Sequence, residues 1–570
     1  MKSIAIKLFF TVLFYPIFSL LIFTVFKPIF NSDSLIFPYA IHPFDIIKTY
    51  PYTWMLIKKW YFISFSISYA ILSFHIFSLI GLIFLHHQSK PKSPHFHKHP
   101  VNNSSLKLFI GLNQNKKIYL DEFGLYQNVL VTGTIGSGKT SSIMYPITRQ
   151  LICYKSSLED EKISMLILDV KGNYYKQVLS FANETERLSD VVVIDLSGNT
   201  TYNPLDKPSL SPIVLANRLK TILTLFSPNN QESYWLDKSE QFLAECIKFC
   251  RLYNDGYVTF SEIHKLVLLK DYYQEKLNLT KKFFLENKYN KNQVYDLLTC
   301  IDFFEKEIFS LDERTLSILR SEISRITNIF VSDYNVSRTF CPQKKDITFP
   351  GFEFAIKTGK IVVLNLNIAE YRNLSKIIAS YLKLDFQTEV LSQMKSSSFI
   401  RKTAFISDEY HEYVTQTDSD FFAESREAKC INIVATQSYS SIRKALHDDL
   451  SSNVIIQGLV NKLWFRTDDN YTIEEIQKQL GKEEKEKTSR TISENARETK
   501  YNLAINSLLS SGSSISESIN VYSQNDYIYD SNFFSQKLQT FNCLAFISDG
   551  MKVQKPHEIT TIPYYLQKGV

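Results

Sequence analysis

Residues 129–142, VLVTGTIGSGKTSS, decide the fold class of this 570-residue chain. The stretch contains a complete G-x-x-x-x-G-K-[ST] pattern. The apolar residues before the pattern predict a buried strand, and TSSIMYPITRQLI after it predicts a helix. A strand, a glycine-rich loop and a helix in this order predict an α/β protein with a phosphate-binding loop. The residues of the pattern are Gly133, Thr134, Ile135, Gly136, Ser137, Gly138, Lys139 and Thr140.

Each part of this loop suits a bound phosphate. The glycines let backbone N–H groups turn inward, and the start of the helix adds its positive end. Lys139 is placed to reach the terminal phosphates, and the Thr140 hydroxyl is a ligand for Mg²⁺. We therefore predict that ATP and Mg²⁺ bind to the eight residues of the pattern and to Ser141. Pro146 interrupts the following helix and predicts a kink there.

Two adjacent carboxylates supply the acidic half of such a site. In TAFISDEYHEY, a short apolar strand ends in Asp408 and Glu409. Paired carboxylates at the end of a strand allow one to hold Mg²⁺ and the other to polarise the attacking water. We assign these roles to Asp408 and Glu409 respectively. The alternative is an acidic turn that closes a buried strand.

A third polar position follows in SREAKCINIVATQSYSSI. The apolar run in this stretch predicts another buried strand, and Gln437 comes just after it, where its amide could contact the γ-phosphate and the catalytic water. Arg426 precedes this strand and could face a neighbouring subunit as an arginine finger. A surface salt bridge is the alternative role for Arg426.

The N-terminal region predicts a membrane anchor. Residues 8–26 and 60–85 carry no formal charge, and the first of these segments would be about 28 Å long as a helix. A cleaved signal peptide would need a small-x-small site, which does not follow Phe26. Two spans place both termini on one side, and an ATP site places that side in the cytosol. The histidine-rich residues 86–100 are interpreted as a basic linker beside the bilayer.

Composition adds weaker constraints. A net charge of +6 permits contact with nucleic acid and does not demand it. Seven cysteines without a C-x-x-C pair are typical of reduced thiols in the cytosol. Cys246 and Cys250, one helical turn apart, are interpreted as core residues and not as metal ligands.

The ordered set of motifs resembles the conjugative coupling proteins of type IV secretion, the TraG/TraD-like membrane ATPases. The resemblance covers nearly the whole chain and has one departure, Asn173, where that family usually has glutamate; we give Asn173 no catalytic role. The motifs are GTIGSGKT, DVKGNY, NPLD, SDEY, ATQSY with its preceding arginine, FRTDDNYTIEEIQKQLG and ISDGMKVQK with the later PYYL.

The resemblance implies a RecA-like P-loop NTPase domain interrupted by an all-α domain and preceded by two transmembrane helices. We expect a membrane anchor and linker in residues 1–100, a nucleotide-binding domain in 101–209 and 345–570, and the all-α domain in 210–344. The helical pattern of YWLDKSEQFLAECIKFC supports this interruption independently. The charged residues 482–500 are expected to be a solvated loop or insertion.

The resemblance further implies a two-pass protein of the cytoplasmic (inner) membrane that works as a hexameric ring with other type IV secretion components. Its substrate would be DNA, a relaxase-type protein, or the two linked together. Protein-only secretion is one alternative, and a chromosomal DNA translocase of the same motor superfamily is another. A receptor or scaffold with an inactive nucleotide site is a third, which the intact Lys139, Asp408, Glu409 and Gln437 argue against.

Overall fold

The computed structural model describes residues 105–566, apart from 170, 226–232, 287–289, 367–370, 372, 396–398, 496–499, 503–506 and 510–513, and also residues 51, 52, 55 and 59. The chain divides into two units, Met1–His95 and Phe96–Val570, and the architecture below is that of the second. The expected membrane spans, 8–26 and 60–85, lie outside the described residues. Within the described part of the chain, no helix is both long enough and apolar enough to cross a bilayer.

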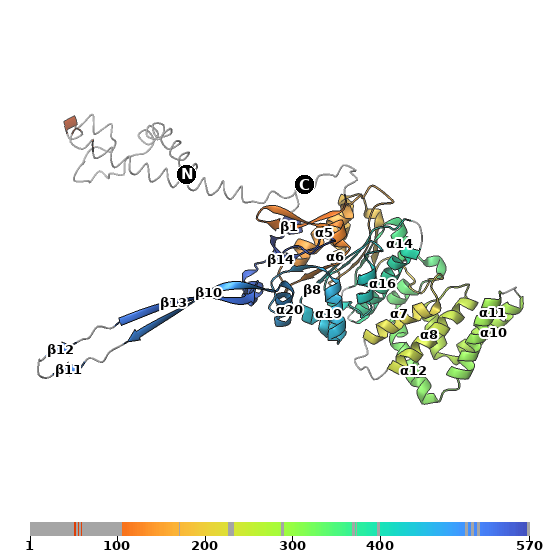
Figure 1. Ribbon diagram of the computed structural model, residues 1–570. Coiled ribbons are helices and arrows are strands. Elements are labelled where there is room, and N and C mark those ends of the chain that lie inside the picture. Colours follow the sequence, from red (N-terminus) through yellow and green to blue (C-terminus); the bar gives the residue numbers. More distant parts are fainter. Residues whose placement is uncertain are drawn as a thin grey trace. The chain divides into compact units, whose positions relative to one another are not determined.

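The second unit is built on a mixed sheet of eleven strands (Figure 1). The strands are parallel from β9 to β5, and the remaining four are antiparallel at the other edge. This confirms the α/β class. In spatial order the strands are β2 (Lys116–Asp121), β1 (Lys107–Asn113), β15 (His557–Thr560), β14 (Asn542–Phe546), β9 (Asn461–Trp464), β3 (Val129–Thr132), β8 (Cys430–Thr436), β7 (Thr403–Ser407), β4 (Ser164–Leu168), β6 (Ile361–Leu364) and β5 (Val191–Ile194).

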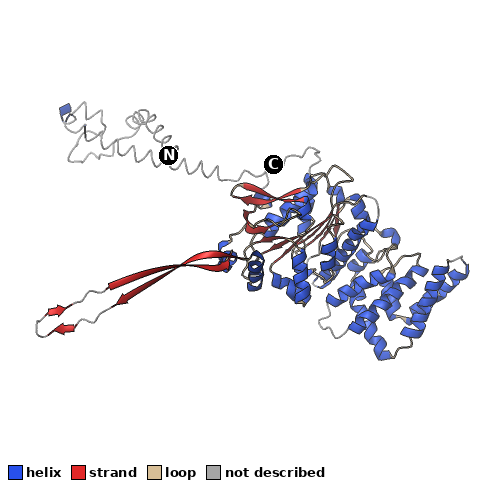
Figure 2. Ribbon diagram, in the orientation of Figure 1, coloured by secondary structure: helices blue, strands red, loops and turns tan. Residues whose placement is uncertain are grey.

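Helices cover both faces of the parallel strands (Figure 2). Alternate residues of one strand enter different cores: Val129 and Val131 of β3 pack in one, and Leu130 in the other. Strands buried on both faces need continuous apolar runs, which explains VLV, MLIL and IVVL in the sequence. The first face carries α5 (Tyr145–Cys153) and α6 (Tyr174–Glu184). The second carries α14 (Phe352–Thr358), α16 (Asn373–Ser392), α17 (Asp418–Glu424), α18 (Tyr439–Leu446) and α19 (Asp449–Gly458).

Between β5 and β6 the chain forms a helical region. Its interior is rich in aromatic rings, and Cys246 and Cys250 are buried in it, as their spacing predicted. The helices fall inside the expected all-α segment, while the domain boundaries themselves stay a prediction. The helices are α7 (Pro212–Leu225), α8 (Ser233–Tyr253), α9 (Phe260–Leu268), α10 (Lys270–Glu286), α11 (Lys291–Asp302), α12 (Glu313–Val331) and α13 (Tyr334–Phe340).

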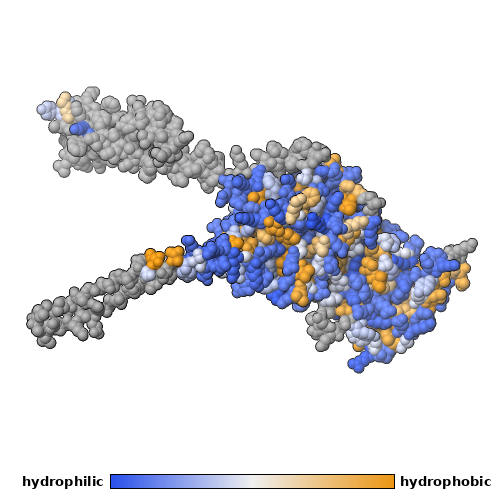
Figure 3. All heavy atoms as spheres, in the orientation of Figure 1, coloured by the Kyte–Doolittle hydropathy of each residue, from blue (hydrophilic) through white to orange (hydrophobic). Residues whose placement is uncertain are grey.

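The charged segment 482–500, expected to be a solvated loop or insertion, is not a loop. Most of it is β10 (Lys482–Asn495), which pairs residue for residue with β13 (Ser514–Tyr527) in a long antiparallel ribbon (Figure 2). Lysine and glutamate are weak strand formers, so the pairing with β13, which contributes Ile519, Val521 and Tyr522, overrides local propensity. Figure 3 shows exposed apolar side chains on this ribbon, where Ile519 and Val521 are 62% and 61% exposed.

The remaining elements are two helices, two short strands and several single turns. They are α4 (Glu122–Leu125), α20 (Asn470–Leu480), the short strands β11 (Lys500–Asn502) and β12 (Ser507–Leu509), the π-helical turns η1 (Thr140–Met144), η4 (Phe303–Ile308) and η8 (Phe533–Lys537), and the 3₁₀ turns η2 (Leu188–Asp190), η5 (Lys344–Asp346), η6 (Gln393–Lys395), η7 (Tyr410–Glu412) and η9 (Tyr564–Leu566). Of these, α20 packs with η8 around the buried Trp464 in a small separate core.

Candidate nucleotide site

The phosphate-binding loop follows β3 at the carboxyl end of the parallel strands. The helix after it differs from the sequence expectation. Its first turn, η1, is π-helical, and the α-helix begins only at Tyr145. Pro146 therefore lies in the first turn of α5, directly after the π-helical turn. The proline that predicts a kink thus stands at the transition from π-helix to α-helix.

Residues far away in the sequence hold the loop in place. The Gly133 amide donates to the Gln437 carbonyl over 3.2 Å, and the Thr134 amide donates to the Arg466 carbonyl over 2.8 Å. On the other side, the Phe541 amide donates to the Ser137 carbonyl over 3.1 Å. The loop is thus fixed by the turns after β8 and β9 and by the turn before β14. Arg466 belongs to the FRTDDNY motif and Phe541 to none of the motifs, and neither side chain reveals the contact, because both residues hold the loop through their backbone.

Both the backbone angle and the surrounding space require a glycine at position 138. Its φ of +102° lies in the region that side chains avoid. A Cβ atom at Gly138 would also lie 2.5 Å from the ring of Phe541. Only glycine fits between the loop and this ring.

Lys139 is folded back onto its own loop. Its ammonium donates to the carbonyl oxygens of Gly133 and Thr134, the latter over 3.2 Å, and the side chain is nearly buried. Burial lowers the pKa of Lys139, and the nearby carboxylates of Glu409 and Asp408 oppose that shift. A phosphate would offer this ammonium a stronger, charge-assisted partner than two neutral carbonyls.

The predicted magnesium ligands lie together. The Thr140 hydroxyl donates to Asp408 Oδ2 over 2.8 Å, and Asp408 is 1% exposed. Burial raises the pKa of Asp408, and the hydrogen bond from Thr140 opposes this. A hydroxyl and a carboxylate at the start of the loop helix are the hard oxygen donors that Mg²⁺ prefers. The donor set therefore fits the predicted ion.

Glu409 has an unusual backbone and an unpaired oxygen. Its φ is +51°, in the left-handed region, and its amide donates to Asp408 Oδ1 over 3.1 Å. The side chain is 8% exposed, yet its Oε2 has no hydrogen-bond partner among the described residues. A buried carboxylate oxygen without a partner is costly, and such costs concentrate where a group must act. The geometry suits a carboxylate that accepts a proton from water.

A histidine beside this carboxylate was not predicted from the sequence. His411 Nδ1 lies 3.8 Å from Glu409 Oε2 and 3.1 Å from the Thr436 hydroxyl. Burial lowers the pKa of His411, with Glu412 opposing the shift. His411 thus links the turn after β7 to the end of β8. The signal in the sequence is SDEYHEY, where His411 stands two residues after Glu409.

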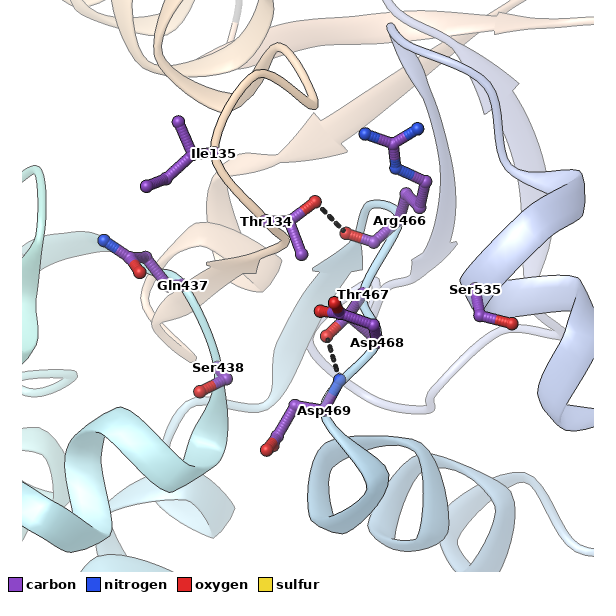
Figure 4. A pocket seen from close by; sticks show the side chains of 9 residues that line it. All are labelled: Thr134, Ile135, Gln437, Ser438, Arg466, Thr467, Asp468, Asp469 and Ser535. Carbon is purple, nitrogen blue, oxygen red and sulfur yellow. Dashed lines mark hydrogen bonds between the residues drawn. The ribbon is translucent and has the colours of Figure 1, made fainter.

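Gln437 lines a cavity of 520 Å³ beside the loop (Figure 4). In the close-up, Gln437 and Ser438 lie on one side of Thr134 and Ile135, and residues 466–469 lie on another. Gln437 therefore lies beside the loop and contacts it through its carbonyl, while a contact of its side-chain amide with phosphate stays a prediction. The cavity is lined by Thr134, Ile135, Gln437, Ser438, Arg466, Thr467, Asp468, Asp469 and Ser535.

Arg426 lies away from the other predicted site residues. It is exposed, in the turn before β8, and so lies at the amino ends of the parallel strands, whereas the loop lies at their carboxyl ends. In the described part of the chain, Arg426 forms no ion pair that would support the surface salt bridge. The structure does not bring Arg426 to the nucleotide loop of its own chain.

The acid at the end of β4 has a different character. Asp169 accepts hydrogen bonds from the amides of Lys171, Asn173 and Tyr174, each 3.1 Å long. Its carboxylate thus caps the start of α6 through backbone amides. No cluster of three metal-ligating side chains occurs in the described residues, so the oxygens of Thr140 and Asp408 remain the candidate ligands for a metal.

Residues 402–523 match the family model described as the TraM recognition site of TraD and TraG. No curated protein matches the chain.

Among solved structures, the bacterial conjugative coupling protein TrwBdeltaN70, in its unbound monoclinic form, has a TM-score of 0.52 at 11% identity, covering 80% of this chain and 89% of its own. TrwB with a non-hydrolysable GTP analogue, GDPNP, also has a TM-score of 0.52, at 10% identity and with 81% and 96% coverage. TrwB with ADP and Mg²⁺ has a TM-score of 0.52 at 10% identity, covering 83% of this chain and 92% of its own. At these identities the likeness concerns the fold. Residues 402–523 are thus similar in sequence to the TraG/TraD family, and the chain is similar in fold to a conjugative coupling protein.

Proposed function

We propose that this protein is an ATPase of the cytoplasmic (inner) membrane that recruits a conjugative substrate, a single DNA strand linked to a relaxase, and pumps it into a type IV secretion channel. The observation that carries the proposal is the pairing of Thr140 with Asp408 beside Glu409, whose Oε2 has no partner in the described residues. This is the constellation that ATP hydrolysis requires next to a phosphate-binding loop. The solved TrwB complexes with ADP and Mg²⁺ and with GDPNP support nucleotide binding by this fold.

The chemistry follows from the positions of the side chains. The loop amides and Lys139 hold the β- and γ-phosphates, and Lys139 leaves its carbonyl partners to do so. Mg²⁺ held by Thr140 and Asp408 would neutralise phosphate charge. Glu409 takes the proton from the water that attacks the γ-phosphorus, while the bond from that phosphorus to the ADP oxygen breaks.

Two further residues complete the proposed cycle. Gln437 senses the γ-phosphate from the end of β8. Arg426 acts on the site of a neighbouring subunit in a hexameric ring, which is consistent with its exposed position away from its own loop. Two N-terminal spans, with both termini cytosolic, would anchor this ring to the membrane. Other type IV secretion components would be its partners, including an accessory protein of the kind named in the family model over residues 402–523.

The test is ATP hydrolysis by the full chain purified in detergent, with and without single-stranded DNA. We expect DNA to stimulate hydrolysis, and Lys139→Ala to abolish it while the protein remains folded. Hydrolysis that is lost in the variant but indifferent to DNA would favour protein-only secretion. Absence of hydrolysis under all assembly conditions would overturn the proposal in favour of a receptor. Stimulation by double-stranded DNA alone would favour a chromosomal translocase.

A further inference from the structure

Helix α16 is buried along most of its length, yet it carries four ionisable side chains in its interior: Lys383, Asp385, Glu389 and, at its start, the half-buried Lys376. Charges are rarely buried unless they are paired, so each must have a partner. Lys383 and Asp385 are two positions apart in the helix and therefore point to opposite sides of it. The two sides lead to different parts of the molecule.

The first side of α16 holds the turn that follows Glu409. The Lys383 ammonium donates to Asp418 Oδ2 over 2.6 Å, to the Thr415 hydroxyl over 2.8 Å and to the Tyr413 carbonyl over 2.7 Å. Lys383 and Asp418 are both fully buried. All three donor positions of the ammonium are thereby used on a single turn of chain.

Asp418 completes this first network. It accepts hydrogen bonds from the Tyr410 hydroxyl, from the Thr415 amide over 3.0 Å and from Gln387 Nε2 over 2.9 Å. Tyr410 directly follows Glu409, so the network fixes the residue next to the strained backbone of the catalytic carboxylate. An ion pair between Lys376 and Glu412 adds a half-buried contact from the same helix.

The second side of α16 holds the entry to the helical region. Asp385 accepts hydrogen bonds from Arg218 Nη1 of α7 over 2.8 Å and from the Tyr202 hydroxyl. Lys207 lies 3.3 Å from Asp385 and 3.5 Å from Glu389. Tyr202 and Lys207 belong to the segment between β5 and α7, and Arg218 belongs to the first helix of the region.

We propose that α16 couples the helical region to the catalytic turn, with Lys383 and Asp418 as positioning residues for Glu409 and Asp385 with Arg218 as the anchor at the other side. Neither pair touches the phosphate-binding loop. A packed helix transmits a displacement of one side to the other because its interior cannot deform gradually. The inference deepens the proposed function, because it gives the helical region a route to the hydrolytic carboxylate.

Three variants of the full chain test the coupling. Lys383→Met with Asp418→Asn removes the first ion pair without leaving a lone buried charge, which limits the loss of stability. Tyr410→Phe is a milder variant that deletes one donor and keeps the ring. Arg218→Met loosens the second side, in a helix remote from the nucleotide. Lys162→Met is the control: this buried lysine also pairs with an acid, Asp190, 2.9 Å away, but at the amino ends of the strands, and Asp190 keeps Arg187 as its partner.

Two measurements decide the outcome. Amide hydrogen exchange in residues 408–418 needs neither ATP nor DNA, and we expect faster exchange in the double variant and in Arg218→Met, but not in the control. For ATP hydrolysis we expect kcat to fall on the order of 10- to 100-fold in the double variant and by less in Tyr410→Phe, with KM unchanged. A merely structural role would lower thermal stability in the control and the test variants alike, without this selective loss of kcat.

Unchanged exchange in the catalytic turn of Arg218→Met would overturn the coupling. Unchanged exchange and kcat in the double variant would overturn the positioning role. If the wild-type chain hydrolyses no ATP, the proposed function fails, and the exchange experiment still decides whether α16 links the two regions.

Discussion

The two ends of the parallel strands bury charge in opposite ways. At the amino ends, Arg187 donates to Asp190 over 3.0 Å and to the carbonyls of Ile152, Ile163 and Gly359. At the carboxyl ends, Glu409 keeps an oxygen without a partner in the described part of the chain. A satisfied charge holds strands together, whereas an unsatisfied charge is available to a substrate. Burial alone therefore does not reveal function in this sheet.

The largest expected effect is at the carboxyl ends of the strands, where Glu409 has the unpaired oxygen. Glu409→Gln keeps the size of the side chain but removes the proton acceptor. We expect kcat for ATP hydrolysis to fall about 10²- to 10⁴-fold, because that is the usual contribution of a general base. Nucleotide binding, measured by calorimetry with a non-hydrolysable analogue, should be nearly unchanged. A variant with normal kcat would remove the contrast between the two ends.

The next largest effect is at the amino ends of the strands, where every guanidinium nitrogen of Arg187 donates a hydrogen bond, and it concerns stability. Arg187→Met leaves three backbone carbonyls and part of Asp190 without a donor in the sheet interior. We expect a loss of about 3 to 5 kcal/mol in the free energy of unfolding, measured with urea, because one partner of a buried network is removed. At temperatures where the variant stays folded, kcat should equal that of the wild type. A selective loss of kcat would mean that this end also serves the reaction.

The sequence predicted the carboxyl end better than the amino end, for a physical reason. Lys139, Thr140, Asp408 and Glu409 stand at fixed spacing after apolar strands, and these spacings are visible in a motif. Arg187 is satisfied by carbonyls from three separate segments, and no local pattern encodes such contacts.

The same limit explains the other differences between expectation and structure. Phe541 supports the loop through its amide and ring from the far C-terminal part of the chain. The strand β10 depends on pairing with β13, which is distant in sequence, so its lysines and glutamates predicted a loop. The π-helical turn before Pro146 is set by how the loop joins the helix, and the helical pattern of the sequence carries no sign of it.

A smaller effect is expected from a charge at the amino end that has no acid beside it among the residues that the structure describes. Lys462 is buried, its ammonium donates to the Leu459 carbonyl over 2.9 Å, and burial lowers its pKa to about 8. Between that value and the ordinary 10.5, the unfolded chain binds more protons than the folded one, so stability should rise with pH in this window and be constant below it. Lys462→Met should stabilise the protein at pH 7 by about 2 kcal/mol and should flatten this rise.

Urea denaturation at pH 7 and at pH 9 to 10 checks the prediction for Lys462. The exposed Lys116 provides a matched control, since Lys116→Met should change neither the stability nor its dependence on pH. If Lys462→Met destabilises the protein at both pH values, then the hydrogen bond to Leu459 outweighs the cost of burying the charge.

The smallest expected effect tests whether a buried acid is structural or catalytic because of its hydrogen-bond partners and not because of its position in the sheet. Asp169 lies at the carboxyl ends, on the strand beside that of Asp408, but its carboxylate accepts three backbone amides. Its position near Asp408 suggests a part in the reaction, whereas its hydrogen bonds to backbone amides make it a cap for α6. Asp169→Ala should therefore cost about 1 kcal/mol of unfolding free energy, as the loss of a helix cap does, and should leave kcat within about twofold of the wild type. A fall in kcat comparable with that of Glu409→Gln would contradict this expectation. It would show that position at the carboxyl ends decides the role of a buried acid, and that an acid with all its hydrogen bonds made can still take part in the reaction.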